Sequence, residues 1–215
     1  MNAVKFDDLH SYNDFRLILN SKTIGKAEPK TELIDVPAAD GELDYTEYFG
    51  EIRYKNRPLS FQFTSLASPA DFPALYSRLQ NLLNGRKMKI TLTEDADYYY
   101  IGRVTVNDWE TNKRIGKVVI DVNAEPYKLK RAQTVIHQTI TEATVITCYN
   151  ERKSVIPEIT ASAEVFVEVG KYSKSTNEII FGYDDIVFTQ GQNFLRVTPV
   201  NGAADVTIKY QEGSL

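Results

Sequence analysis

The chain has 215 residues, with 25 Lys and Arg against 29 Asp and Glu, and a net charge of −4. A mildly acidic chain is a poor candidate for binding nucleic-acid phosphates over a broad surface, although DNA passing through a symmetric channel is not excluded. The single cysteine, Cys148, excludes an intrachain disulfide, and no stretch is apolar over the length of a membrane span.

Short strands dominate the first part of the chain. Residues 15–20 and 30–36 predict two early strands, with glycine and proline in the turn between them. The stretch VPAADGELDYTEYFGEIRYKNRPLSFQF, residues 36–63, reads as strand, polar loop and strand. In its last part Leu59, Phe61 and Phe63 alternate with Ser60 and Gln62, which is typical of a half-buried strand.

The loop inside this stretch carries carboxylates and aromatic rings but no nucleophile, general base or metal-ligand set. We therefore expect an assembly device that projects from its own subunit over residues 37–50 and packs on a neighbouring one. The candidate contact residues are Asp40, Glu42, Asp44, Tyr45, Glu47, Tyr48 and Phe49.

Residues 68–85 predict one helix. Ser68 is expected as its N-cap, Pro69 as its first helical residue and Gly85 as the residue that follows its C-cap. An apolar stripe at helical spacing predicts the face that packs on the core, namely Phe72, Leu75, Leu79, Leu82 and Leu83.

Alternating strands resume at residues 88–92, 98–106 and 118–124, which predicts an α+β unit: an antiparallel meander with one helix packed on it. The basic segment 125–133 contains a proline and no apolar face, so we expect a domain boundary there. The predicted domains are residues 1–130 and residues 131–215. Alternating strands and closely spaced turn signals predict that the second domain is an all-β sandwich.

No residue pattern indicates an enzyme, a cofactor or a transition-metal site. His10 and His137 are far apart and lie in no metal-binding spacing, and Cys148 has no flanking signature of a catalytic thiol. Glu94, Asp95 and Asp97 could hold calcium, but a solvated turn accounts better for them, as it does for Asp184 and Asp185. The tyrosines at 98–100 and Trp109 could stack on a sugar, but strand alternation would divide the tyrosines between two faces.

Several segments resemble, in the same order, parts of the distal tail proteins of siphophages. The loop stretch above is similar to the family's V-P-G-R-D-G-like turn. The other matching segments are LQNLLNGRKMKITLTEDADYYYIGRV, VIDVNAEPYK and FTQGQNFLRVTPVNGAADVTIKYQEGSL. Two departures exist: Ala38 and Ala39 stand where Gly and a basic residue are common, and NERKSVIPEI lacks a glycine of the family.

The resemblance implies a structural protein of the phage tail tip, assembled in the cytoplasm of a bacterial host. The N-terminal domains would form a hexameric ring, and the C-terminal domains would be sandwiches likened to galectins or carbohydrate-binding modules. The ring would join the tail tube to the tail-associated hub protein and, in many phages, to receptor-binding proteins. DNA would be a partner only by passing through the channel. The start of the chain lacks the apolar region of a signal peptide, so no membrane anchor is expected.

Two other function classes stay open. A carbohydrate-binding module would need exposed aromatic side chains in the second domain, where the candidates are Tyr149, Phe166, Tyr172, Phe181, Tyr183, Phe188, Phe194 and Tyr210. A tail-associated hydrolase would need a paired acid and base, which the sequence does not reveal.

Overall fold

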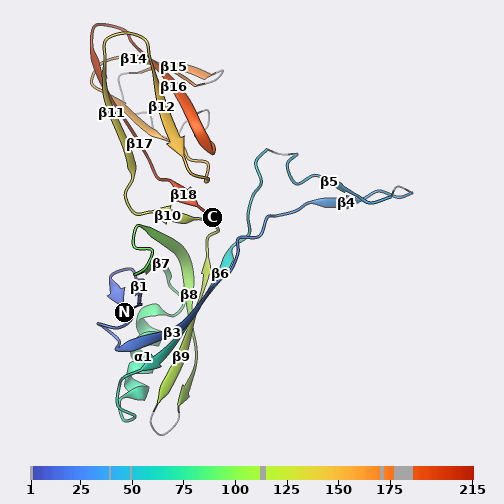
Figure 1. Cartoon of the computed structure of the whole chain (residues 1–215), viewed down its shortest axis with the longest axis vertical. Helices are drawn as coiled ribbons and strands as arrows, with labels where there is room; N and C mark the ends of the chain where they lie inside the picture. Colours follow the sequence, from blue (N-terminus) through green and yellow to red (C-terminus); the bar gives the residue numbers. More distant parts are fainter. Residues whose placement is uncertain (1, 39, 49, 112–114, 170–171, 177–185) are drawn as a thin grey trace. The chain divides into compact units, whose positions relative to one another are not determined.

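The chain is built mainly from antiparallel β-strands, and the described residues contain one α-helix (Figure 1). This computed structural model describes all residues except 1, 39, 49, 112–114, 170–171 and 177–185. Contacts between residues divide the chain into two compact units, Met1–Lys128 and Leu129–Leu215. The expectation of a mostly β chain with a single helix is confirmed, whereas independent folding of the two units stays a prediction.

The first unit contains β1 (Val4–Phe6), β2 (Leu9–His10), β3 (Leu17–Ile24), β4 (Leu33–Asp35), β5 (Glu42–Asp44), β6 (Arg57–Ser65), α1 (Phe72–Leu83), β7 (Lys87–Leu92), β8 (Tyr98–Thr111) and β9 (Gly116–Ala124). After β10 (Lys128–Lys130) come β11 (Thr134–Ile140), β12 (Thr144–Asn150), β13 (Glu158–Ala161), β14 (Val165–Val169), β15 (Tyr172–Thr176), β16 (Gly191–Pro199), β17 (Ala204–Tyr210) and β18 (Gly213–Ser214).

The main sheet of the first unit has the strand order β2-β1-β7-β8-β9-β6-β3. Its neighbouring strands are antiparallel, and Phe61 of β6 lies opposite Ile120 of β9. The strands β1 and β6 are not neighbours in the sheet, yet the rings of Phe6 on β1 and Phe61 on β6 meet edge to face at 6.3 Å. The sheet is therefore curled. Alternation of apolar residues along β6 and β9 creates the buried face, which includes Leu59, Phe61, Phe63, Val118, Ile120 and Val122.

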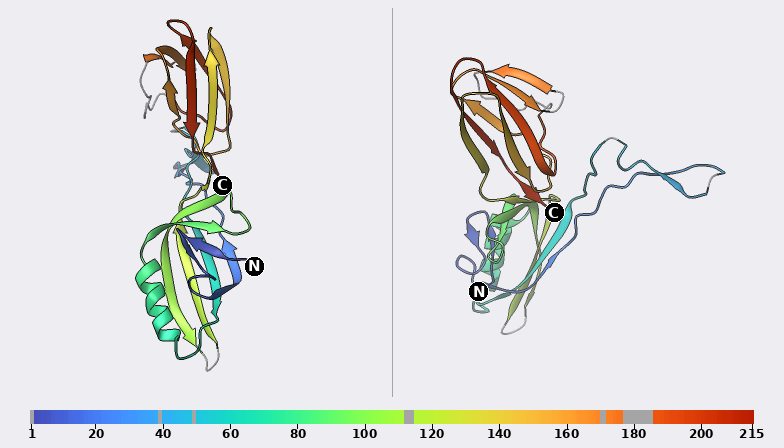
Figure 2. Two further views of the ribbon diagram at one scale, coloured as in Figure 1. Left: turned by 90° about the vertical axis from the view of Figure 1, so that its left-hand side faces the viewer. Right: turned by 45° about the horizontal axis from the view of Figure 1, so that its top comes forward.

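The helix covers the core side of this sheet (Figure 2), but it begins later than the sequence predicted. Its N-cap is Asp71, so the assignments of Ser68 as N-cap and Pro69 as first helical residue are wrong. The Ser68 hydroxyl instead donates to the Asp71 carboxylate at 2.6 Å and helps to hold a turn before the helix. Leu79 and Leu83 are fully buried in the core, and Gly85 follows the C-cap with φ of +76°.

The glycine of the Tyr-x-Gly motif on β8 is required by close packing. A Cβ atom on Gly102 would lie 2.5 Å from Cγ1 of Val122 and 2.7 Å from Cα of Ala124, both on β9. Because the second contact is with backbone, it cannot be relieved by a side-chain rotation. This position therefore lets β8 and β9 pair closely while Tyr100 and Val104 on either side of it are buried.

The second unit consists mainly of two antiparallel sheets around a common apolar core. Their strand orders are β11-β17-β13 and β12-β16-β14-β15. Residues from both sheets share the core, including Ile146, Cys148, Val167, Leu195, Val206 and Ile208. Tyr210 packs its ring edge to face on Phe188 at 5.2 Å and donates its hydroxyl to the Tyr149 carbonyl at 2.6 Å.

The end of the second unit is tied to its beginning. The Lys130 N–H donates to the Glu212 carbonyl at 3.0 Å, and the Lys153 N–H donates to the Gly213 carbonyl at 2.9 Å. The carboxylate of Glu212 is buried, yet it accepts from the Lys130 ammonium at 2.9 Å and from the Thr134 hydroxyl. These partners compensate for burial of the charge, and the hydrogen bond raises the pKa of Lys130.

Some predicted strands differ from the structure. The strand expected at residues 15–20 begins at Leu17 and continues to Ile24, with an irregularity between Leu19 and Ser21. In place of the strand expected at residues 185–189, the described residues 186–189 form an isolated bridge. The N–H and the carbonyl of Phe188 are both hydrogen-bonded to Val155. The strand expected at residues 178–182, and Asp184 and Asp185, lie outside the described residues.

Candidate functional site

A long hairpin leaves the main sheet between β3 and β6, and we call residues 28–55 the arm (Figure 1). At its root the Lys30 N–H donates to the Arg53 carbonyl at 2.8 Å and the Lys55 N–H donates to the Glu28 carbonyl at 2.7 Å. Farther out, β4 and β5 form a separate two-stranded sheet. Ten residues of extended chain, from 28 to 38, span roughly 33 Å, so the arm is long enough to reach a neighbouring molecule.

The outer half of the arm has an acidic face and an apolar face. The register pairs Asp35 with Glu42, Ile34 with Leu43, and Leu33 with Asp44. Because side chains alternate along a strand, Asp35, Glu42 and Asp44 share one face with Leu33, whereas Ile34 and Leu43 lie on the other. Asp35 and Glu42 are thus two carboxylates directly across the ladder, an unfavourable pair in a free hairpin.

The apolar side chains of the arm are exposed to solvent. The exposed fractions are 50% for Leu33, 49% for Ile34, 38% for Val36, 48% for Leu43 and 72% for Tyr48. Scattered exposed apolar residues are ordinary, but five on one hairpin are a concentration of apolar surface, with Leu33 on the acidic face and Ile34 and Leu43 on the other. A surface of this kind is typical of a segment that is covered by a partner.

A turn after β5 orders the aromatic part of the arm. The rings of Tyr45 and Tyr48 meet edge to face at 5.3 Å, and the Tyr48 N–H donates to the Tyr45 carbonyl at 3.0 Å. The Asp44 carboxylate accepts from the Thr46 N–H at 2.8 Å, and the side chain and backbone of Thr46 lower the pKa of Asp44. Asp44 therefore stays ionised, and its charge is held at a fixed place on the acidic face.

The structure brings most of the candidate contact residues together on the arm. Asp40, Glu42, Asp44, Glu47 and Tyr48 are exposed, Tyr45 is half-buried, and Phe49 lies outside the described residues. Their contact with a neighbouring subunit stays a prediction.

The strand predicted at residues 30–36 is present as the shorter β4, which pairs with β5. The sequence interpretation overlooked β5, which lies within the predicted polar loop. It missed Leu33, Ile34 and Asp35 as exposed arm residues. The signal was present: Asp40-Gly41 between the alternating segments LID and ELD is a hairpin turn pattern, and Gly41 has φ of +78°.

The histidines and the cysteine of the described residues each have a local structural environment and form no metal-binding cluster. His10 accepts through Nδ1 from the Tyr12 N–H at 3.1 Å, and His137 Nδ1 lies 2.9 Å from the Thr207 hydroxyl. Among the residues that the structure describes, no three His, Cys, Asp or Glu side chains gather as metal ligands. Burial raises the pKa of Cys148 to about 11, so its thiol is protonated at neutral pH.

The acidic turn after β7 is used in ion pairs. The Asp95 carboxylate lies 2.8 Å from the Lys128 ammonium, and Glu94 pairs with Lys22. Lys128 also lies over the ring of Tyr98, 4.3 Å from its centroid. Two of the carboxylates that could bind calcium are thus already paired with lysine side chains, which favours the interpretation of a solvated turn.

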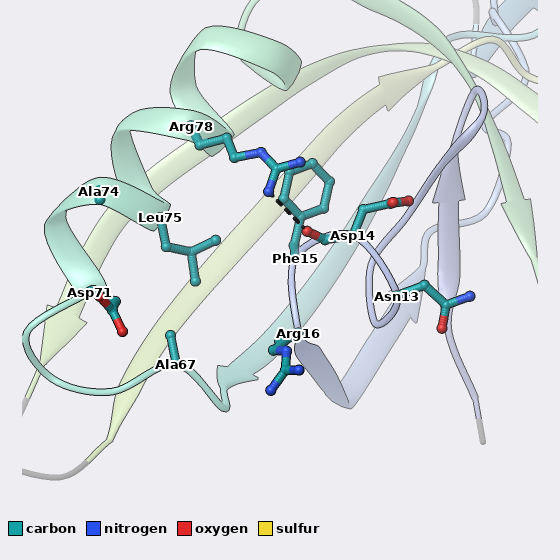
Figure 3. Close-up of a pocket in the computed structure, with 9 residues that line it drawn as sticks. All are labelled: Asn13, Asp14, Phe15, Arg16, Ala67, Asp71, Ala74, Leu75 and Arg78. Atoms are coloured by element: carbon teal, nitrogen blue, oxygen red, sulfur yellow. Dashed lines mark hydrogen bonds between the residues drawn. The ribbon is translucent and has the colours of Figure 1, made fainter.

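A shallow pocket of about 360 Å³ lies beside α1 (Figure 3). The Arg78 guanidinium lies over the Phe15 ring at 5.3 Å and donates to the Asp14 carbonyl at 3.2 Å. Asp71 already accepts from Ser68. Two charged side chains of the pocket, Arg78 and Asp71, are therefore engaged within the protein. Nothing described in the pocket points to a particular ligand.

The outer face of the β12-β16-β14-β15 sheet carries exposed aromatic rings. Tyr149 is 60% exposed and Phe194 is 58% exposed. The register places Thr147 opposite Phe194 and Tyr149 opposite Gln192, so the two rings are diagonal neighbours on this face. Arg196, two residues beyond Phe194, pairs with Glu168 at 3.7 Å.

In the described part of the chain, no helix is both long enough and apolar enough to cross a membrane.

Comparisons with known proteins give a likeness to solved structures. No family model matches the sequence, and no curated protein sequence matches it. Among solved structures, the chain is similar to the Dit (gp 19.1) protein of phage SPP1, described as a paradigm of the hub adsorption apparatus in phages infecting Gram-positive bacteria. The two chains superpose over 100% of each with a TM-score of 0.70 and 12% sequence identity. At this identity the likeness establishes the fold, and it agrees with the resemblance seen in the sequence.

Proposed function

We propose that this chain is a structural component of a siphophage tail tip, a hub that joins the tail tube to the adsorption apparatus. The observation that carries the proposal is the full-length likeness to the SPP1 Dit protein, which covers both units of the chain. In this role the protein resides in the virion, assembles in the bacterial cytoplasm, and contacts DNA only where it passes through the channel.

In the proposed assembly the first unit forms a closed ring, which is expected to be hexameric. The second unit is a separate domain, a galectin-like sandwich. The arm supports ring formation, because it exposes apolar residues and sets two carboxylates, Asp35 and Glu42, opposite each other. A ring of identical subunits needs heterologous contacts, in which one patch of each copy meets a different patch on the next. An arm that reaches to a neighbour provides such a contact. The tail tube protein, the tail-associated hub protein and receptor-binding proteins are the partners proposed for the ring.

The test is the mass of the purified full chain across a range of concentrations, followed by negative-stain imaging. We expect a closed six-fold ring with a central hole at high concentration. A protein that stays monomeric at every concentration, and does not bind a purified tail tube, would contradict the proposal.

A second candidate function is binding of host glycans by the second unit. The observation that favours it is the exposed pair Tyr149 and Phe194 beside the ion pair of Arg196 and Glu168. Aromatic faces can stack on sugar rings, and charged planar groups can bind vicinal hydroxyls. Both rings are among the aromatic candidates that the sequence offered for this function, and they share one face of the sheet.

A glycan array with the full chain tests the second candidate. Specific binding that Tyr149→Ala and Phe194→Ala each abolish, and that Val145→Ala retains, would support it. Val145 is a suitable control because it lies on the same face of β12 and is 57% exposed without an aromatic ring. An array on which no glycan is bound above background would remove this candidate.

A further inference from the structure

The charges of the arm are divided between its two ends. Residues 35–51 contain six carboxylates, Asp35, Asp40, Glu42, Asp44, Glu47 and Glu51, and no lysine or arginine. The root instead exposes Lys26, Lys30, Arg53 and Lys55, accompanied by Glu28 and Glu32. The hairpin is therefore negative toward its tip and positive toward its root.

Each end of the arm holds a like-charge pair across its ladder. At the root, Pro29 bridges to Tyr54, and the two flanking hydrogen bonds set Lys30 opposite Arg53. Toward the tip, Asp35 lies opposite Glu42. Like charges directly opposite each other are unfavourable in a ladder. An approaching charge of the other sign would relieve either pair.

The acidic tip and the basic root of one arm cannot reach each other. Its two sides are joined by hydrogen bonds both at the root and at β4 and β5, so it is a continuous hairpin. Five residues of extended chain separate Lys30 from Asp35, roughly 17 Å, which is longer than a direct ion pair. Tip and root of one arm are thus held apart and cannot neutralise each other, although Glu28 lies opposite Lys55 within the root.

We infer that the acidic face at the tip of one arm (Asp35, Glu42 and Asp44) docks on the basic root (Lys30, Arg53 and Lys55) of the arm of a second copy. This inference rests on the proposed ring and names the surface that receives the arm. Each copy then gives its tip to one neighbour and its root to the other. Such a contact is heterologous and can be repeated around a closed ring. Opposite charges select the register of the two hairpins, while Leu33, which is exposed on the acidic face, supplies apolar contact area.

Two charge-reversed variants of the full chain test the docking. The tip variant carries Asp35→Lys and Glu42→Lys, and the root variant carries Lys30→Glu and Arg53→Glu. All four side chains are exposed, so we expect both variants to keep the melting temperature of the wild type. Alone, each should need about tenfold or more higher concentration to assemble than the wild type. Lys117→Glu is the control, because Lys117 is an exposed cation on β9 away from the arm.

Mixing the two variants is the decisive measurement. In an alternating ring, each reversed tip meets a reversed root and each natural tip meets a natural root, so assembly measured by sedimentation should return toward the wild-type concentration. If the variants assemble like the wild type, or if the mixture stays as weak as its parts, the docking is overturned while a ring of the wild type still stands. A wild type that never assembles would instead overturn the ring and the docking together.

Discussion

Removing the outer half of the arm should weaken assembly without unfolding the subunit. The change replaces residues 33–48 with a short Gly/Ser bridge and keeps the hydrogen-bonded root at Lys30 and Arg53. The described side chains of the deleted segment are exposed or half-buried and lie outside the core of the first unit. We therefore expect the melting temperature of the shortened chain to match that of the wild type.

The size of the effect follows from the exposed apolar residues. Five side chains, Leu33, Ile34, Val36, Leu43 and Tyr48, are 38–72% exposed. Covering about half of each is worth roughly 1 kcal/mol, or about 5 kcal/mol in all. Ordering of side chains and incomplete cover reduce this to about 2–3 kcal/mol for each interface. The deletion should then raise the dissociation constant of an interface by roughly 30- to 150-fold.

Sedimentation velocity over a concentration series measures this change. The control is the wild type in the same buffer, with circular dichroism of both proteins to show that the sheets are retained. If the shortened chain forms the same closed oligomer at the same concentration, the arm makes no contribution to assembly, and the reasoning from its exposed apolar residues is refuted.

Three further predictions concern stability and domain division. Leu79→Ala should lower the free energy of unfolding by about 2–5 kcal/mol, because Leu79 is fully buried, and a loss well below 1 kcal/mol in urea titration would contradict this. Burial raises the pKa of Cys148 from its ordinary value of 9.0 to about 11 and that of Tyr210 from 10.0 to about 12. Folding therefore favours the protonated forms of both groups. Their contribution to the free energy of unfolding is complete below pH 9 and is lost as the pH rises toward 11 and 12. Urea titrations at several pH values should show this loss of stability, and the loss should be smaller in Cys148→Ala. Limited proteolysis should cut at residues 131–133, which are exposed and follow the hydrogen-bonded strand β10, and release a stable N-terminal fragment, whereas first cleavage inside β9 would argue against two independent domains.

The main sheet could be predicted from the sequence because its strands bury one face only. Alternation along β6, β7, β8 and β9 places each buried residue two positions from the next, and this period is visible without a structure. The predicted start of α1 is wrong because Ser68 makes a local side-chain contact in place of the helix cap that was expected. The Ser68 hydroxyl bonds to the Asp71 side chain instead of capping the helix, and sequence preferences do not distinguish these two uses of a serine.

The arm shows a different limit of sequence reasoning. The segment LID has the composition of a buried strand, and its residues are exposed only because β4 pairs with β5 and not with the main sheet. Strand patterns reveal which residues share a face but not what covers that face. The charges of the loop led to the prediction of a contact surface, whereas the separation of basic root and acidic tip becomes visible only with the pairing register.

A subunit that offers one tip and one root, each matched to the other, has consequences for how assembly proceeds in time. Every open arc of such subunits ends in one free tip and one free root, whatever its length, so growth has a direction and no intermediate is complete. The subunit that closes the ring makes two contacts at once, and the second forms at the high effective concentration of an intramolecular step. Closed rings should then exchange subunits much more slowly than arcs, because a subunit leaves only after two interfaces have opened together.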